Sequence, residues 1–318
     1  MDKQKLGAGR RAFPAPNALL MKRFLTRGLR REMEGIIFAF PYLLVWGTFV
    51  LWPLGYGVYL SLFDWHPIRG SKFVGFANYI ALFQDVRFLN ALSNSFRFAV
   101  IVVPLVLIVA FLFALLLWGW KGNRRLSSFA QAVFFFPYLL TVSVIAITWR
   151  WFLDPDFGLV TIALKYLRIQ APTFLTDPFW ALPAIALATA WWLSGYRMVV
   201  FQAALSDIPQ ELFEAAILDG ARLNQLLFHI ILPLLKPAIL FSLVLTTISA
   251  FRTFGQVLMM TEGGPGRATE VLALYVYWNA FEYFRIGKAA AAGVVMLFFT
   301  LLLTLLGMKI LGLKSELY

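Results

Sequence analysis

The chain has 318 residues, of which 61% are hydrophobic and 14% are charged. A soluble domain is usually about half apolar and a quarter charged, so an ordinary soluble protein is excluded. Cysteine is absent, which excludes disulfides and thiolate metal sites, and the net charge is +12. The apolar residues come in long runs, so we interpret the basic excess as a membrane topology signal and not as a nucleic-acid-binding surface.

Residues 1–34 are predicted to be a basic cytoplasmic tail. They contain nine basic residues: Lys3, Lys5, Arg10, Arg11, Lys22, Arg23, Arg27, Arg30 and Arg31. The apolar run that follows is too long for the hydrophobic region of a signal peptide, so we expect it to be retained as a membrane helix.

Six apolar runs are each long enough to cross a bilayer core, which takes about 20 residues. The predicted spans are Gly35–Phe63, Phe98–Trp120, Leu126–Trp149, Pro178–Leu205, Pro237–Met260 and Ala289–Met308. The sequence therefore predicts an all-α polytopic membrane protein, with six transmembrane helices in a domain of residues 35–313. Residues 314–318 form its C-terminus.

Six spans place both chain ends on one side of the membrane, and the distribution of charge indicates the cytoplasmic side. On that side the tail is joined by Lys121, Arg124, Arg125, Lys309 and Lys314. The basic residues of the opposite loops are diluted by Asp64, Asp85, Asp154, Asp156, Asp177, Glu262, Glu270 and Glu282. The loop between the fourth and fifth spans, residues 206–234, is then cytoplasmic.

This cytoplasmic loop is too polar to be a simple span. Its sequence predicts a helix capped by Asp207, with Pro209 in the first turn and a left-handed stop at Gly220. A second helix, Asn224–Leu232, is expected to end before Pro233. Two interpretations stay open here, a connector lying along the membrane surface and an element that docks to another protein. The small side chains and the capped geometry favour docking.

The segment "EAAILDGARLNQLLFHIILPLLKP" closely resembles the EAA signature of permeases in binding-protein-dependent ABC importers. "PLGYGVYLSLFDW", "FVGFANYIALFQD", "FFFPYLL" and "TEGGPGRATEVLALYVYWNAFEYFRIGKAAAAG" resemble the carbohydrate-uptake branch, of the maltose or glycerol-3-phosphate type. The long external domain of some maltose-type members has no counterpart here. The resemblance implies a type I importer fold in which the loop is a coupling helix that enters a cleft of the ATP-binding subunit. The implied coupling residues are Glu214, Ala215, Ala216, Asp219, Gly220, Ala221 and Arg222.

The resemblance also implies a set of partners and a location. They are a second homologous permease, two ATP-binding subunits, an extracytoplasmic solute-binding protein and a carbohydrate, in the cytoplasmic membrane of a bacterium or archaeon. The sequence contains no GxxxxGK[ST] phosphate loop, so we expect no ATPase activity from this chain. ATP and Mg would be held by the partner subunits, and no metal or cofactor is expected on this chain.

Polar and aromatic residues within the fourth and fifth spans are the candidates for the substrate pathway, because such groups usually face a bundle interior. They are Thr189, Trp192, Tyr196, Thr246, Ser249, Arg252 and Thr253. Sugar contacts in the resembling permeases come from these two helices, and spacing from Glu214 adds Leu193 and Ala250. Arg252 either lines the pathway or pairs with the partner permease, and Arg197 is expected nearer the cytoplasm, snorkelling or pairing with Asp207. A contact with the binding protein is predicted at Gly263, Gly264 and Pro265.

Two other functions compete with an importer subunit. A secondary transporter would favour internal repeats and intramembrane acids, and neither is clear in the sequence. A membrane scaffold would use the cytoplasmic loop only for docking.

Overall fold

The computed structural model describes residues 35–66, 68, 70–119 and 124–310. The predicted tail, residues 1–34, and the predicted C-terminus, residues 314–318, lie outside the described residues. The chain divides into two compact units between Tyr56 and Gly57, and each is described by itself. Within these described residues, four helices are long and apolar enough to cross a membrane, or up to six spans are present if two bent pairs each count as one.

The first of these helices is Gly35–Ser61, which agrees with the predicted span Gly35–Phe63. It includes a π-helical stretch, η1 (Gly47–Leu51), followed by α2 (Trp52–Ser61). Its side chains are apolar and mostly exposed within the chain, as expected for a surface that faces lipid.

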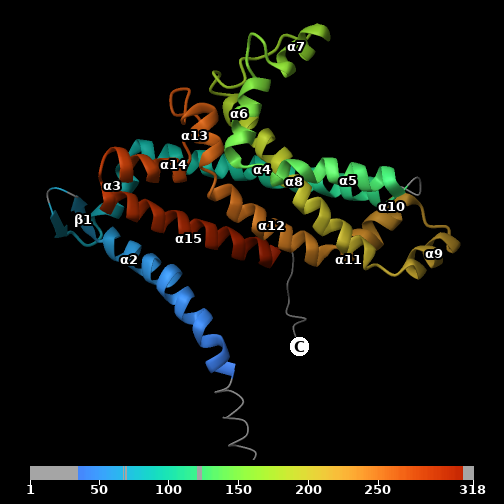
Figure 1. The fold of residues 1–318 in the computed structure, drawn as a ribbon, viewed down its shortest axis with the longest axis horizontal. Helices are drawn as coiled ribbons and strands as arrows, with labels where there is room; N and C mark the ends of the chain where they lie inside the picture. Colours follow the sequence, from blue (N-terminus) through green and yellow to red (C-terminus); the bar gives the residue numbers. More distant parts are fainter. Residues whose placement is uncertain (1–34, 67, 69, 120–123, 311–318) are drawn as a thin grey trace, which may run out of the picture. The chain divides into compact units, whose positions relative to one another are not determined.

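The second unit is mostly helical (Figure 1). After α2 its elements are β1 (Phe63–His66), β2 (Gly70–Phe73), α3 (Ala77–Gln84), α4 (Val86–Trp118), α5 (Arg124–Leu139), α6 (Val142–Phe152), α7 (Leu159–Tyr166), α8 (Ala181–Ser206), α9 (Gln210–Leu218), α10 (Leu223–Leu226), η2 (Leu227–Ile231), α11 (Leu232–Leu234), α12 (Lys236–Phe251), α13 (Gly255–Thr261), α14 (Leu272–Tyr277), η3 (Trp278–Glu282) and α15 (Ile286–Ile310). The antiparallel hairpin β1–β2 lies in a loop for which no strand was expected.

The second span begins earlier than predicted. The sequence predicts Phe98–Trp120, but α4 is a 33-residue helix that starts at Val86. At 1.5 Å per residue it is about 50 Å long, well beyond the roughly 30 Å hydrocarbon core. Its polar first turns are stabilised by distant parts of the chain: Asn94 donates from Nδ2 to the backbone oxygens of Arg267 and Glu270, both at 3.1 Å.

The third and fifth predicted spans are not single straight helices. The segment predicted as Leu126–Trp149 is broken between α5 and α6, with a bend of 103°. Pro137 lies in the last turn of α5, where its missing N–H weakens continuation of the helix. The segment predicted as Pro237–Met260 stops at Phe251, and α13 is a separate helix after it.

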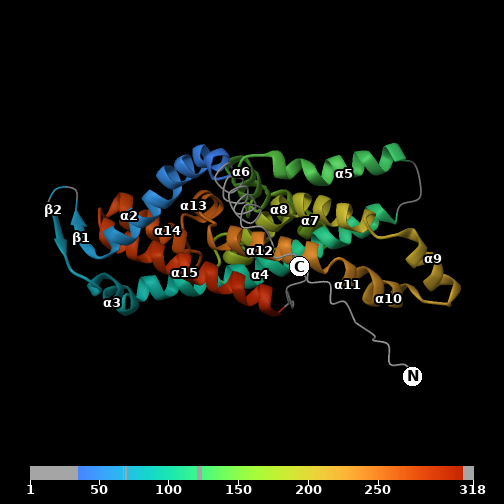
Figure 2. The ribbon, with the colours of Figure 1, turned by 90° about the horizontal axis from the view of Figure 1, so that it is seen from below.

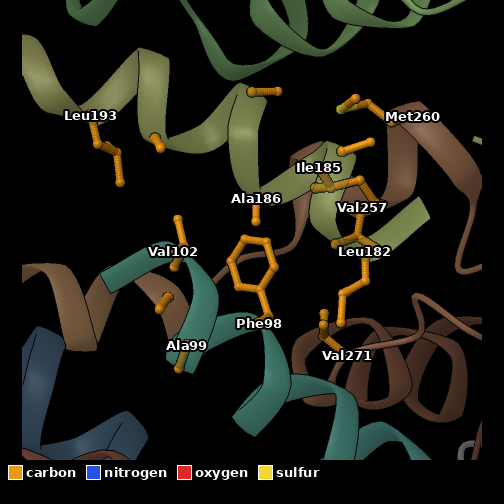
Figure 3. Packing of buried hydrophobic residues seen from close by; sticks show 14 of the residues in the cluster. Phe98, Ala99, Val102, Leu182, Ile185, Ala186, Leu193, Val257, Met260 and Val271 are labelled. Carbon is orange, nitrogen blue, oxygen red and sulfur yellow. The ribbon is translucent and has the colours of Figure 1, made fainter. Parts of the chain in front are cut away.

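Helix α8 is the most buried of the four candidate spans, and it packs against α4, α5, α6, α12 and α13 (Figure 2). Figure 3 shows its contact with α4, where Phe98 and Val102 meet Ala186 and its neighbours. Small residues permit close packing here. A Cβ on Gly195 would collide with the backbone oxygen of Phe134 and lie 2.9 Å from Cα of Phe135, both in α5.

A separate hydrophobic cluster supports the loop between α8 and α12. Phe201 and Leu205 of α8 pack with α4, together with Ile231 of η2 and Leu235. Both ends of the loop 206–234 are therefore anchored on the same helix pair, α4 and α8.

Candidate functional site

Helix α9 begins at Gln210, only a few residues after the end of α8 at Ser206. The predicted cap is wrong: Asp207 is the C-cap of α8, and Pro209 occupies the N-cap position of α9 without any side-chain cap. Proline there is compatible with a helix start, because its fixed φ suits the first turn and its missing N–H would have no helical partner. Glu211 then lies in the first turn, near the positive end of the helix dipole.

Gly220 has the left-handed conformation that was predicted, with φ of +80°. The N–H of Gly220 donates to the backbone oxygen of Ile217 at 3.0 Å, and the N–H of Ala221 donates to that of Ala216 at 2.9 Å. These bonds satisfy carbonyl groups at the end of α9. A Cβ at Gly220 would meet nothing within 4 Å, so backbone conformation is the reason for glycine here.

The second helix of the loop begins at Leu223. The backbone N–H of Arg222 donates to Oε1 of Gln225 at 2.7 Å, which fixes this start. Helical geometry then continues through η2 and α11 to Leu234, so the predicted end before Pro233 is wrong. Pro233 lies in the first turn of a new short helix, where proline is tolerated, and the chain bends by 65° before α12.

The predicted coupling residues form an accessible surface, which we call the α9–α10 surface and define as residues 210–226. Of the seven residues predicted, Ala216 and Ala221 are half-buried, and these are exposed: Glu214, Ala215, Asp219, Gly220 and Arg222. The sequence interpretation missed the apolar residues beside them, of which Leu218 is 87% and Leu223 83% exposed. Phe213 holds the surface to the end of α4 through a ring contact with Trp118, at a centroid distance of 5.2 Å.

A cavity of about 760 Å³ lies among α5, α6, α8, α12 and α13, and we call it the α8–α12 cavity. It is lined by Tyr138, Val142, Thr189, Trp192, Leu193, Arg197, Ile248, Ser249, Arg252, Thr253, Phe254, Gly255, Gln256, Leu258 and Met259. Five of the seven predicted pathway residues are among them. The walls therefore combine aromatic rings with hydroxyl, amide and guanidinium groups.

The other two predicted pathway residues do not line the cavity. The ring of Tyr196 stacks on that of Tyr138 at 5.1 Å, so Tyr196 supports a lining residue. Thr246 is fully buried and donates from Oγ1 to the backbone oxygen of Ser242 at 2.6 Å. Ala250 is likewise buried in the core and is not a lining residue.

The expectation that Arg197 would snorkel or pair with Asp207 is also wrong. Arg197 is 4% exposed and lines the cavity, and Nε donates to Oγ1 of Thr246 at 3.3 Å. Its guanidinium carbon lies 5.0 Å from the ring centroid of Tyr196. It forms no ion pair with Asp207, because α8 turns this side chain toward α12 and away from the end of the helix.

Tyr138 and Trp192 connect the cavity to the break between α5 and α6. Nε1 of Trp192 donates to the backbone oxygen of Leu140 at 3.2 Å, which satisfies a carbonyl at the break. Sequence reasoning missed Tyr138, and the Pro137-Tyr138 pair in a predicted span was the available signal for a bend and a polar aromatic side chain beside it.

The residues predicted to contact a binding protein lie in the turn after α13. Gly264 and Pro265 line a second cavity, of about 410 Å³, together with residues of the 150–155 and 173–176 segments, whereas Gly263 is buried. Hydroxyl groups organise the turn: Oγ1 of Thr269 donates to the backbone oxygen of Gly264 at 2.7 Å. Glu270 follows at once and forms an ion pair with Arg87.

Asp85, at the N-cap of α4, is the centre of a cluster of polar side chains. Nζ of Lys288 and the hydroxyl of Tyr275 donate to its Oδ2 at 2.7 and 2.8 Å, and the N–H of Arg87 donates to its Oδ1 at 2.9 Å. Burial acts to raise the pKa of Asp85, but these bonds and the charge of Lys288 lower it to about 2. In the described part of the chain, no group of three or more His, Cys, Asp or Glu residues could hold a metal ion.

Comparison with known proteins gives consistent matches along most of the chain. Residues 74–312 match the family described as binding-protein-dependent transport system inner membrane component. The chain is 35% identical to a probable ABC transporter permease of Bacillus subtilis, YurN, over 85% of this chain and 94% of that protein. It is 32% identical to the sulfoquinovosyl glycerol transport system permease SmoG of Agrobacterium fabrum, over 89% of this chain and 92% of that one. The crystal structure of a bacterial ABC transporter that imports the acidic polysaccharide alginate contains a chain of similar fold, with a TM-score of 0.77, 22% identity and coverage of 92% and 99%.

Proposed function

Because the chain belongs to the family of binding-protein-dependent transport system inner membrane components, we propose that it is the permease subunit of an ATP-driven importer for a sugar or oligosaccharide. The substrate would be delivered by an extracytoplasmic solute-binding protein. A second homologous permease and two ATP-binding subunits would complete the complex. ATP and Mg would be bound by those subunits, since this sequence has no phosphate loop.

One observation carries this proposal: helix α8 both leads into an accessible helical loop and forms part of the wall of a polar cavity. The α9–α10 surface follows α8 directly, and Thr189, Trp192 and Arg197 of α8 line the cavity. Movement imposed on the loop is therefore transmitted along a rigid helix to the cavity wall. This arrangement suits alternating access driven by a separate ATPase.

A sugar suits the cavity chemically. Tyr138 and Trp192 offer aromatic faces for its C–H surfaces, while Thr253, Ser249 and Gln256 offer groups for its hydroxyls. The transport system of SmoG, named for sulfoquinovosyl glycerol, is consistent with this choice of substrate class.

The proposed orientation places the α9–α10 surface and both chain ends in the cytoplasm. Cysteines introduced at Ser71 and Arg267, both exposed, should react with an impermeant thiol reagent from outside. A cysteine at Leu223 should react only after the membrane is opened. The native chain has no cysteine, so background labelling is absent, and the reverse pattern would overturn the orientation.

The function itself is tested by reconstitution. The chain is co-produced with a second permease, an ATP-binding subunit and a solute-binding protein from the same organism, and sugar uptake into proteoliposomes is measured. We expect uptake that needs both ATP inside and binding protein outside, and no ATPase activity from the purified chain alone. Uptake driven by an ion gradient without ATP would favour a secondary transporter, and a stable complex without uptake of any sugar would favour a scaffold.

A further inference from the structure

The α8–α12 cavity has an unbalanced positive charge. Among the described residues that line it, the charged ones are Arg197 and Arg252, and no carboxylate is present. An arginine side chain carries a positive charge and offers hydrogen-bond donors but no acceptor. In the described part of the chain, the carboxylates that form ion pairs are Asp85 and Glu270, and their partners are other basic residues.

Arg197 is buried with neutral partners. Its Nε bonds to the hydroxyl of Thr246, and the ring of Tyr196 lies at 5.0 Å. A hydroxyl and an aromatic face compensate only part of the cost of burying a full charge, and a buried ion is normally paired with an opposite charge. The remaining compensation must come from outside the described part of this chain.

Arg252 lies on the same cavity, at the C-cap of α12 where the chain turns toward α13. It is exposed within this chain, and in the described residues no carboxylate lies within ion-pair distance of it. The negative end of the helix dipole favours a cation there but supplies only a fraction of a charge. Its guanidinium can therefore offer a planar pair of N–H donors to a ligand.

We propose that the saccharide carried through the α8–α12 cavity is anionic, and that Arg252 and Arg197 bind its carboxylate, sulfonate or phosphate group. This inference rests on the proposed importer function and adds to it the charge of the substrate. A neutral sugar would leave both guanidinium groups without a counter-charge, whereas an anionic one supplies it and keeps the aromatic and hydroxyl contacts for its ring.

The test uses the complete complex with its binding protein in proteoliposomes. Uptake is measured for matched pairs that differ in charge: trigalacturonate against its methyl ester, sulfoquinovose against glucose, and glucose 6-phosphate against glucose. The member that is transported identifies which anionic group is recognised. We expect transport of an anionic member and little transport of its neutral counterpart. Transport of neutral sugars alone would overturn this inference and leave the importer function standing, whereas no transport of any sugar by the assembled complex would count against both.

Substitutions of the two arginines then test whether they cause the preference for an anionic substrate. Arg252→Gln should lower uptake of the anionic substrate about tenfold, with unchanged affinity of the isolated binding protein. Arg252→Lys should restore part of the uptake, because it keeps the charge and loses the planar pair of donors. Arg197→Gln tests the buried site in the same way. Unchanged uptake in both glutamine variants would overturn the assignment, and so would loss of complex assembly in Arg252→Gln, which would indicate an ion pair with the partner permease.

Discussion

Arg87, in the first turn of α4, forms a bidentate ion pair with Glu270, just before α14, across 183 residues of sequence. Nη2 and Nε of Arg87 lie 2.7 and 2.8 Å from Oε1 of Glu270. The side chain of Glu270 is 2% exposed, so the pair is largely removed from water and joins the start of α4 to the turn after α13.

Replacement of Glu270 by glutamine should destabilise the folded chain strongly. Removal of one partner from a buried pair leaves the other charge uncompensated, which costs about 3 kcal/mol. Thermal unfolding of the purified complex in detergent measures the loss. Arg267→Gln is the matched control, because Arg267 contacts the same carboxylate at 4.0 Å but is 60% exposed, and its loss should cost less than about 1 kcal/mol. If the two variants lowered the melting temperature equally, the buried pair of Arg87 and Glu270 would contribute no more to stability than the exposed contact of Arg267.

The low pKa of Asp85 predicts a stability that depends on pH in the acid range. Its folded pKa of about 2 lies below the ordinary value of 3.8, so the carboxylate contributes stability that is fully present above pH 4. This contribution is lost as the pH falls through 2. The difference in melting temperature between the native chain and Asp85→Asn should be constant from pH 7 to 5 and shrink below pH 4. A difference in melting temperature that stays constant down to pH 2 would contradict the lowered pKa of Asp85.

Gly220→Val should uncouple the complex without preventing membrane insertion. A β-branched residue at φ of +80° costs about 1–2 kcal/mol of backbone strain and displaces α9 relative to α10. We expect weaker co-purification of the ATP-binding subunit, or ATP hydrolysis that substrate no longer stimulates. Gly220→Asn is the control, because asparagine tolerates the left-handed region and open space surrounds the position.

Glu214→Lys tests the same surface by charge reversal. Normal assembly and transport in both Gly220→Val and Glu214→Lys would make the loop only a connector.

Gly195→Ala should weaken the packing of α5 on α8. The added methyl group would meet the backbone of Phe134 and Phe135, which cannot rotate away, so a cost of about 1–3 kcal/mol is expected. Gly293→Ala in α15 is the control, since nothing lies within 4 Å of its Cβ position. A lower melting temperature for Gly195→Ala alone would confirm the close crossing. No difference between the two variants would contradict it.

The apolar runs made the helical type of the membrane segments predictable, but not their ends or breaks. Hydropathy marks where a helix is buried in lipid, whereas α4 extends outward to Val86 because distant polar groups satisfy its first turns. Hydropathy also does not mark the break after Pro137 or the end of α12 at Phe251, because the residues on both sides of each position are apolar enough to continue the run. The short hairpin β1–β2 carries no pattern that distinguishes it from an irregular loop.

For the candidate sites, local chemistry was predictable and side-chain direction was not. The positive φ of Gly220 follows from its sequence context, and five of the predicted pathway residues in the fourth and fifth spans line one cavity. Tyr196 and Thr246 have suitable chemistry, but Tyr196 stacks on Tyr138, and the hydroxyl of Thr246 bonds to the backbone oxygen of Ser242 and to Arg197. Arg197 was misplaced because only the packing of α8 against α12 determines which way a buried guanidinium points.

The broken helix pair α5–α6 has a consequence for synthesis of the protein. These helices have 16 and 11 residues, so each is shorter than the roughly 20 residues that cross a bilayer alone. The backbone carbonyl of Leu140 at the break needs a donor that lipid does not provide. That donor is Trp192, which leaves the ribosome 52 residues later. The third hydrophobic segment therefore completes its backbone hydrogen bonding at the break only after Trp192 of α8 has been made.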